Sequence, residues 1–172
     1  MLIQEKTGEN ANKKLKIIIM FLTPHAATGL YLGSQVNNVW LAFILGIMSH
    51  LILDMIPHGD KNFADNWPRK TKIIRLSIIA AIDLVGIIFM CYILIFNNFI
   101  SLTPSILAAL VGSILPDFIW GFHEVTRDKI SGWIASNILS WFHDLLPDKA
   151  SLIKILSVQL SVLAIFIYLL IK

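Results

Sequence analysis

The chain is poor in charged residues and in cysteine. Only 15% of its 172 residues are Asp, Glu, Lys or Arg, against about 25% in ordinary soluble domains. A soluble domain with so few charged side chains would have too little polar surface to cover its core. The one cysteine, Cys91, excludes an intrachain disulfide, and we find no internal repeat strong enough to claim.

Apolar residues are correspondingly abundant. They make up 56% of the chain, and the mean hydropathy is +0.75. They fall in blocks of about 20 residues, the length that spans a bilayer core about 30 Å thick. Basic residues gather at the ends of these blocks and form no stripe with interleaved aromatics, which argues against a nucleic-acid partner. The sequence predicts an all-α, polytopic membrane helical bundle with membrane lipid as its surroundings.

Four to five of the apolar blocks are predicted to span the membrane. They cover residues 15–35, 38–57, 73–96, 103–122 and 151–171. Residues 130–146 alternate apolar and polar side chains and carry Trp133 and Trp141, a pattern typical of an interfacial helix. The polar residues 1–14 are predicted to be a disordered extension, which leaves 15–172 as a single transmembrane domain. Translation from Met1 and from Met20 both stay open.

The basic residues predict the orientation of the chain. With a cytoplasmic N-terminus, the cytoplasmic segments hold eleven Lys and Arg residues, whereas the opposite side holds only Lys172. Lys and Arg are enriched in cytoplasmic loops of membrane proteins. We therefore expect a multi-pass protein of the inner (plasma) membrane with its N-terminus in the cytoplasm.

Ionisable residues inside the apolar blocks are the candidates for function, since each costs about 2.5–3.5 kcal/mol to insert. His50 and Asp54 stand four residues apart, so both point the same way from a helix. That spacing suits an imidazole nitrogen and a carboxylate oxygen that bind one metal ion. The alternative is a hydrogen-bonded pair that packs the bundle. His58 and Asp60 continue the run of candidate groups.

Three further ionisable residues, His25, Asp83 and Asp117, lie in other blocks. His25 and Asp117 fall, like the His50 and Asp54 pair, within about ten residues, or about 15 Å, of the cytoplasmic ends of their helices. Their shared depth predicts a single cavity near that face. Asp83 lies about ten residues into its block, near mid-membrane, where we expect a His or Arg partner on a neighbouring helix.

Four motifs together resemble those of a known family. They are TPHAATG with His25, GIMSHLILD with His50 and Asp54, PHGD with His58 and Asp60, and GSILPD with Asp117. The pattern covers about residues 23–123 and resembles bacterial membrane-bound, predicted metal-dependent hydrolases, which include a LexA-regulated inner-membrane protein. That family is distantly similar to zinc-dependent phospholipase C and nuclease-type enzymes.

The resemblance implies hydrolysis of a phosphoester or lipid-like substrate at the cytoplasmic membrane face, with a divalent metal ion, zinc, as cofactor. The candidate catalytic carboxylates are Asp54 and Asp60. The candidate metal ligands are His25, His50, Asp54, His58, Asp83 and Asp117. Two other functions stay open: a small ion, proton or metal transporter, and a structural membrane protein with a buried His and Asp network.

Overall fold

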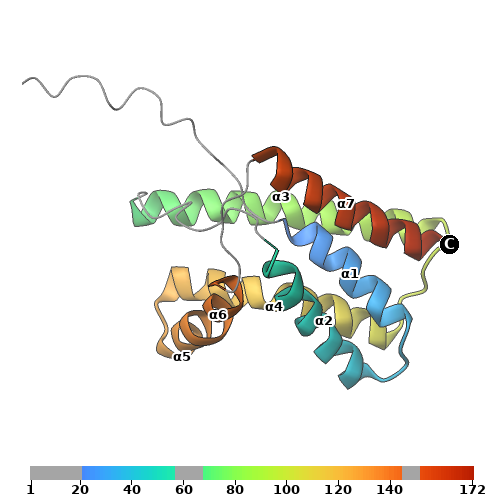
Figure 1. Cartoon of the computed structure of the whole chain (residues 1–172), viewed down its shortest axis with the longest axis horizontal. Coiled ribbons are helices and arrows are strands. Elements are labelled where there is room, and N and C mark those ends of the chain that lie inside the picture. The colour runs from blue at the N-terminus through green and yellow to red at the C-terminus, as the bar shows by residue number, and fades with distance from the viewer. Residues whose placement is uncertain (1–20, 57–67, 145–151) are drawn as a thin grey trace, which may run out of the picture.

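The computed structural model describes residues 21–56, 68–144 and 152–172, and these residues form helices and no strand (Figure 1). The all-α prediction is confirmed. The elements are α1 (Leu22–Ser34), α2 (Val39–Asp54), α3 (Arg69–Phe96), α4 (Pro104–Thr126), α5 (Lys129–Ile134), a π-helical segment (Ala135–Leu139), α6 (Ser140–Asp144) and α7 (Leu152–Ile171). Over the described residues, each predicted apolar block contains one helix.

Local capping residues fix where several helices begin. The side chain of Asn38 accepts a hydrogen bond from Leu41 N at 3.0 Å at the start of α2. Thr103 does the same for α4, where Pro104 occupies the first helical position. Asp128 caps α5. Such residues satisfy backbone N–H groups that have no acceptor within the helix.

The helices differ in length. α3 and α4, with 28 and 23 residues, are the two described helices that are long and apolar enough to cross a membrane. α1 and α2, with 13 and 16 residues, are only about 20 and 24 Å long, shorter than a bilayer core of about 30 Å. By length and composition, two spanning helices are supported, fewer than the four to five predicted.

Small residues let α1, α2 and α4 pack backbone against backbone. A Cβ atom built on Gly46 of α2 would lie 2.9 Å from the backbone nitrogen of Ser113 on α4. One built on Gly112 of α4 would lie 3.2 Å from the nitrogen of Ile47 on α2, and one on Gly29 of α1 would meet α4. Close approach through small residues is a common way for helices to pack in membranes. It draws together the three helices that carry the candidate site.

One end of the bundle holds an apolar core. Leu30, Leu94, Ile100, Ile106 and Leu170 are buried together there. They come from α1, α3, the link after α3, α4 and α7. Figure 1 shows α7 beside α1 on this side of the molecule.

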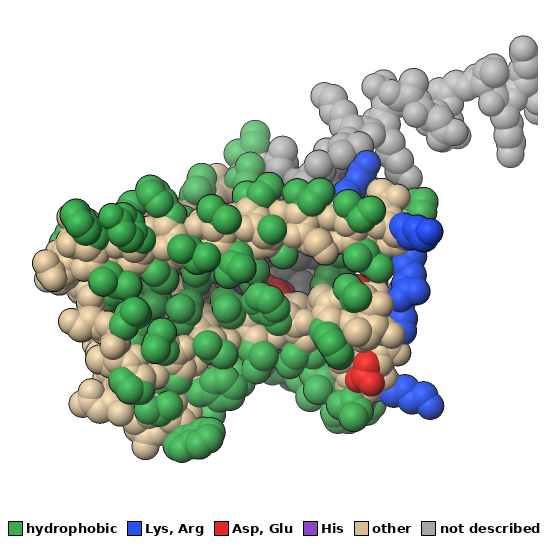
Figure 2. Space-filling view, turned by 180° about the vertical axis from the view of Figure 1, so that it is seen from behind, with side chains coloured by type: hydrophobic (Ala, Val, Ile, Leu, Met, Phe, Trp, Pro, Cys, Tyr) green, Lys and Arg blue, Asp and Glu red, His purple; other side chains and the backbone are tan. Residues whose placement is uncertain are grey.

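The opposite end is basic. Lys72 Nζ lies 3.2 Å from Glu124 Oε1, and Arg127 lies 3.5 Å from the other oxygen of this carboxylate. Arg69 donates a hydrogen bond to the carbonyl of Val125 at 2.8 Å. We call Arg69, Lys72 and Arg127 the basic edge, and Figure 2 shows Lys and Arg side chains along one side of the molecule. Glu124 is buried by these contacts, although its place at the end of an apolar block predicts a solvated side chain.

Candidate metal centre

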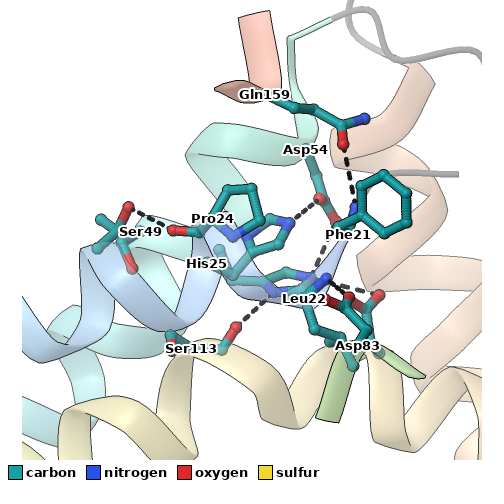
Figure 3. A network of polar contacts seen from close by, with 12 residues as sticks. Phe21, Leu22, Pro24, His25, Ser49, Asp54, Asp83, Ser113 and Gln159 are labelled. Carbon is teal, nitrogen blue, oxygen red and sulfur yellow. Dashed lines mark hydrogen bonds and ion pairs between the residues drawn. The ribbon is translucent and has the colours of Figure 1, made fainter. Parts of the chain in front are cut away.

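Helices α1 and α2 bring two histidines and a carboxylate together in the interior, and Figure 3 shows His25 and Asp54 of this group. His25 and His50 are completely buried, and Asp54 is 8% exposed. One ligand atom from each residue lies within 4.8 Å of the other two. The three residues form a buried group that could hold a metal ion.

The four-residue spacing on α2 sets the geometry of the group. His50 Nε2 lies 3.0 Å from Asp54 Oδ2, one helical turn further on. His25, from the beginning of α1, places its Nε2 atom 3.4 Å from Asp54 Oδ1. Each carboxylate oxygen therefore faces a different imidazole, and the two rings stack with their centroids 4.1 Å apart.

A backbone contact fixes the proton on His50. Its Nδ1 atom lies 2.6 Å from the carbonyl oxygen of Ser113 on α4. A carbonyl only accepts hydrogen bonds, so Nδ1 must carry a proton. In a neutral imidazole, Nε2 then carries a lone pair, and this lone pair faces Asp54 Oδ2. Two electron-rich atoms this close require a proton or a cation between them.

The stacked rings limit how protons can meet this requirement. Two imidazolium ions with centroids 4.1 Å apart would repel each other strongly in an interior of low dielectric constant. A metal ion can instead accept a lone pair from each imidazole and one from the carboxylate. Two histidines and one carboxylate also make up the ligand set of known catalytic metal sites, and His50 has the outer hydrogen bond that such ligands require. The residues present fit a metal ion.

Asp117 lies beside this group rather than within it. Its Oδ1 atom is 3.7 Å from His50 Nε2, and its side chain is 43% exposed. α4 runs on through Pro116 to Thr126, so the carboxylate comes from the middle of a continuous helix. Asp117 thus lies on the exposed side of the three buried residues.

Comparisons of this chain with models of protein families, with curated proteins and with solved structures find no match. The resemblance to membrane-bound hydrolases stays a prediction. The candidate residues His58 and Asp60 lie outside the described residues, and their roles stay predictions as well.

Asp83 has a different environment from the one expected. Its oxygens accept hydrogen bonds from the backbone N–H groups of Leu22 and Thr23 and from the hydroxyl of Thr23. The expectation of a His or Arg partner was wrong, because the positive end of a helix takes the place of a cationic side chain. Nearby, Gln159 of α7 accepts from Phe21 N at 3.3 Å. The sequence gives one signal for Gln159, a polar residue in an apolar block.

Proposed function

We propose that the chain is a multi-pass protein of the inner membrane, with four to five spanning helices and a cytoplasmic N-terminus. α3 supports a lipid environment, because the buried residues of this 28-residue helix are Asp83, Ile87, Met90 and Leu94. Large apolar side chains elsewhere on it are exposed, Ile82 by 66% for example. A core helix of a soluble protein buries such residues, whereas a helix that is apolar all round suits lipid.

The basic edge supports the proposed orientation. It joins the beginning of α3 to the end of α4 at one end of the molecule, and Lys and Arg favour the cytoplasmic side of a membrane. Asp83, which holds the start of α1, lies 14 residues after Arg69 on α3, or about 21 Å along the helix axis. The start of α1, three residues before His25, therefore lies about halfway along α3.

We further propose that the chain is a metal-dependent hydrolase whose metal ion is zinc. The observation that carries this proposal is the buried His25, His50 and Asp54 group, with the His50 tautomer fixed by the carbonyl of Ser113. Three protein ligands leave a fourth position of a tetrahedral zinc ion open for water or substrate. Such a cation acts as a Lewis acid that makes water a stronger acid and polarises a phosphoryl oxygen.

The carboxylates take the remaining roles in this proposal. A residue that accepts the proton of the attacking water must lie within hydrogen-bond reach of it. Asp54 is the first candidate for this role because it belongs to the group, and Asp60 is the second. Asp117 lies beside the group with its side chain 43% exposed, which makes it the candidate residue nearest to the side from which substrate would enter. A site this deep between apolar helices suits the phosphoester of a lipid-like molecule.

The polar residues around the site favour an enclosed centre over a transport pathway. Among the described residues, the buried hydroxyls of Thr28, Ser49 and Ser113 each donate to a carbonyl of their own helix. Beyond them, toward the end opposite the basic edge, the interior is the apolar core around Leu30 and Ile106. An ion crossing this region would lose its hydration without gaining ligands.

Metal analysis and a phosphoesterase assay on the full chain test the proposal. The protein is purified in detergent, and its metal content and its hydrolysis of a chromogenic phosphodiester and of phospholipid vesicles are measured. His50→Ala and Asp54→Ala remove ligands, whereas His123→Ala is the matched control, since His123 is a half-buried histidine outside the group. We expect bound metal and activity in the wild type and in the control, and the loss of both in the ligand variants.

Two results would contradict the proposal. Wild-type protein without stoichiometric metal, even after incubation with zinc, would remove the cofactor. Hydrolysis that His50→Ala and Asp54→Ala leave unchanged would place the activity elsewhere. In either case a His50 imidazolium paired with Asp54, a purely structural arrangement, would explain the close contact between their side chains.

A further inference from the structure

Helix α1 begins inside the bundle, against the middle of α3 (Figures 1 and 3). The first backbone N–H groups of any helix have no acceptor within that helix. In lipid each unsatisfied group costs several kcal/mol, since no water is present to replace the acceptor. Phe21, at the capping position, offers no side-chain acceptor. The acceptors must therefore come from other parts of the chain.

Two other helices supply those acceptors completely. Asp83 of α3 accepts from the N–H of Leu22 and, at 3.2 Å, from the N–H of Thr23. Gln159 of α7 accepts from the N–H of the preceding residue at 3.3 Å. The fourth position, residue 24, is a proline and has no N–H. All four N-terminal positions of α1 are thus accounted for.

Asp83 makes the strongest of these contacts. Its carboxylate is 6% exposed and also accepts from the hydroxyl of Thr23, so three donors converge on it. A negative charge at the N-terminus of a helix is favoured by the helix dipole. Hydrogen bonds to an ionised acceptor are roughly twice as strong as those between neutral groups. The start of α1 is therefore fixed in depth and in rotation by one side chain of α3.

We propose that Asp83 is a positioning residue of the metal centre, which acts through the backbone of α1 and does not bind the metal ion. This inference rests on the proposed function. His25 lies three residues after Leu22, less than one helical turn from the N–H that Asp83 holds. A slip of α1 by one residue would rotate its side chains by about 100°. His25 would then no longer face Asp54.

The test uses Co²⁺ as a spectroscopic probe in full-length protein, together with a measurement that needs no metal. Cobalt absorption gives both the affinity and the geometry of the ligands. The ¹⁵N chemical shifts of the His25 ring nitrogens, measured on apoprotein, report its contact with Asp54. The variants are Asp83→Ala, which removes both acceptors, and Asp83→Asn, which keeps one oxygen. Ser77→Ala is the matched control, since Ser77 is exposed on the same helix.

We expect Asp83→Ala to weaken cobalt binding by about 10–100-fold, the usual effect of losing an outer partner of a metal site, and to change the cobalt spectrum. Asp83→Asn should show a smaller loss in the same direction, and Ser77→Ala none. The His25 ring signals should move in both Asp83 variants. A role in stability alone would lower the unfolding temperature but leave the spectrum and the ring signals of the folded protein unchanged.

The outcomes separate the two proposals. If the wild type binds cobalt and folded Asp83→Ala binds it equally well with an unchanged spectrum, the positioning role is overturned and the metal centre stands. If the wild type binds no cobalt, the proposed function fails, and the His25 ring signals of the apoprotein decide whether Asp83 sets the position of that side chain. If Asp83→Ala does not fold, Asp83→Asn provides the same comparison, and wild-type signals in it overturn the role.

Discussion

Gly112 and Gly121 lie on the same helix in opposite surroundings, and the pair tests the packing that holds the site together. A Cβ atom on Gly112 would meet the backbone of α2, at the carbonyl oxygen of Phe43 and, at 3.2 Å, the nitrogen of Ile47. A Cβ atom on Gly121 would have nothing within 4 Å. The two alanine substitutions are chemically identical and differ only in what the new methyl group meets.

The expected energies follow from this difference. Replacing Gly by Ala within a helix is worth about 1 kcal/mol at either position. At Gly112 the methyl group must displace backbone atoms of α2, and overpacking of this kind costs about 1–3 kcal/mol. We expect Gly121→Ala to stabilise the protein by up to about 1 kcal/mol and Gly112→Ala to lie about 1–3 kcal/mol below it in free energy of unfolding.

The same substitution reaches the metal centre, because α2 carries His50 and Asp54. Displacement of α2 from α4 lengthens the contact between His50 Nδ1 and the carbonyl of Ser113, now 2.6 Å. Equilibrium unfolding in mixed micelles, followed by circular dichroism, gives the stabilities, and cobalt titration gives the effect on the site. Equal stability of the two variants, or a more stable Gly112→Ala, would refute the close approach of α2 and α4.

Three further predictions concern other contacts. A double-mutant cycle of Lys72→Met and Glu124→Gln should give a coupling of about 0.5–3 kcal/mol, because both side chains are largely buried; additive effects on unfolding would contradict the ion pair. The pKa of Asp128 lies below its usual range because its carboxylate accepts a hydrogen bond from Ser131 N. This hydrogen bond should be intact at pH values above the ordinary carboxyl pKa of about 3.9, and it should be lost as the pH falls through the lowered pKa of Asp128 in the folded protein. The amide chemical shift of Ser131 should report this loss in the wild type but not in Asp128→Ala. Removal of bound metal by a chelator should lower the free energy of unfolding by about 2.7 kcal/mol relative to protein with free metal at 100 times its Kd; an equal effect on His50→Ala would place the metal elsewhere.

Much of the helix order could be predicted because its signals are local. Each apolar block is long enough to show in the sequence, and residues such as Asn38 and Thr103 cap the next helix from directly before it. The start of α1 had no such signal, since its acceptors come from residues 61 and 138 positions away in the chain. By length and composition the described helices support two spans, and the other predicted spans stay predictions, because apolar sequence alone does not tell a full span from a shorter helix such as α2.

The candidate site could likewise be predicted only in part. The His50 and Asp54 pair follows from helical spacing, and a shared depth was enough to predict that His25 lies near them. The backbone partners of Asp83 and of His50 Nδ1 could not be predicted, because such groups carry no signal in the residue type. The burial of Glu124 needed the contact between α3 and α4, which no local pattern indicates.

The hydrogen bond from Phe21 to Gln159 also bears on the order in which the protein is made. A ribosome synthesises α1 first and α7 last, so α1 leaves the ribosome before either of its capping residues exists. Its first turn can be completed only after α3 has been synthesised, and fully only after α7 has followed. The metal centre, although both of its histidines lie in the first third of the chain, is therefore among the last parts of the molecule to reach its final form.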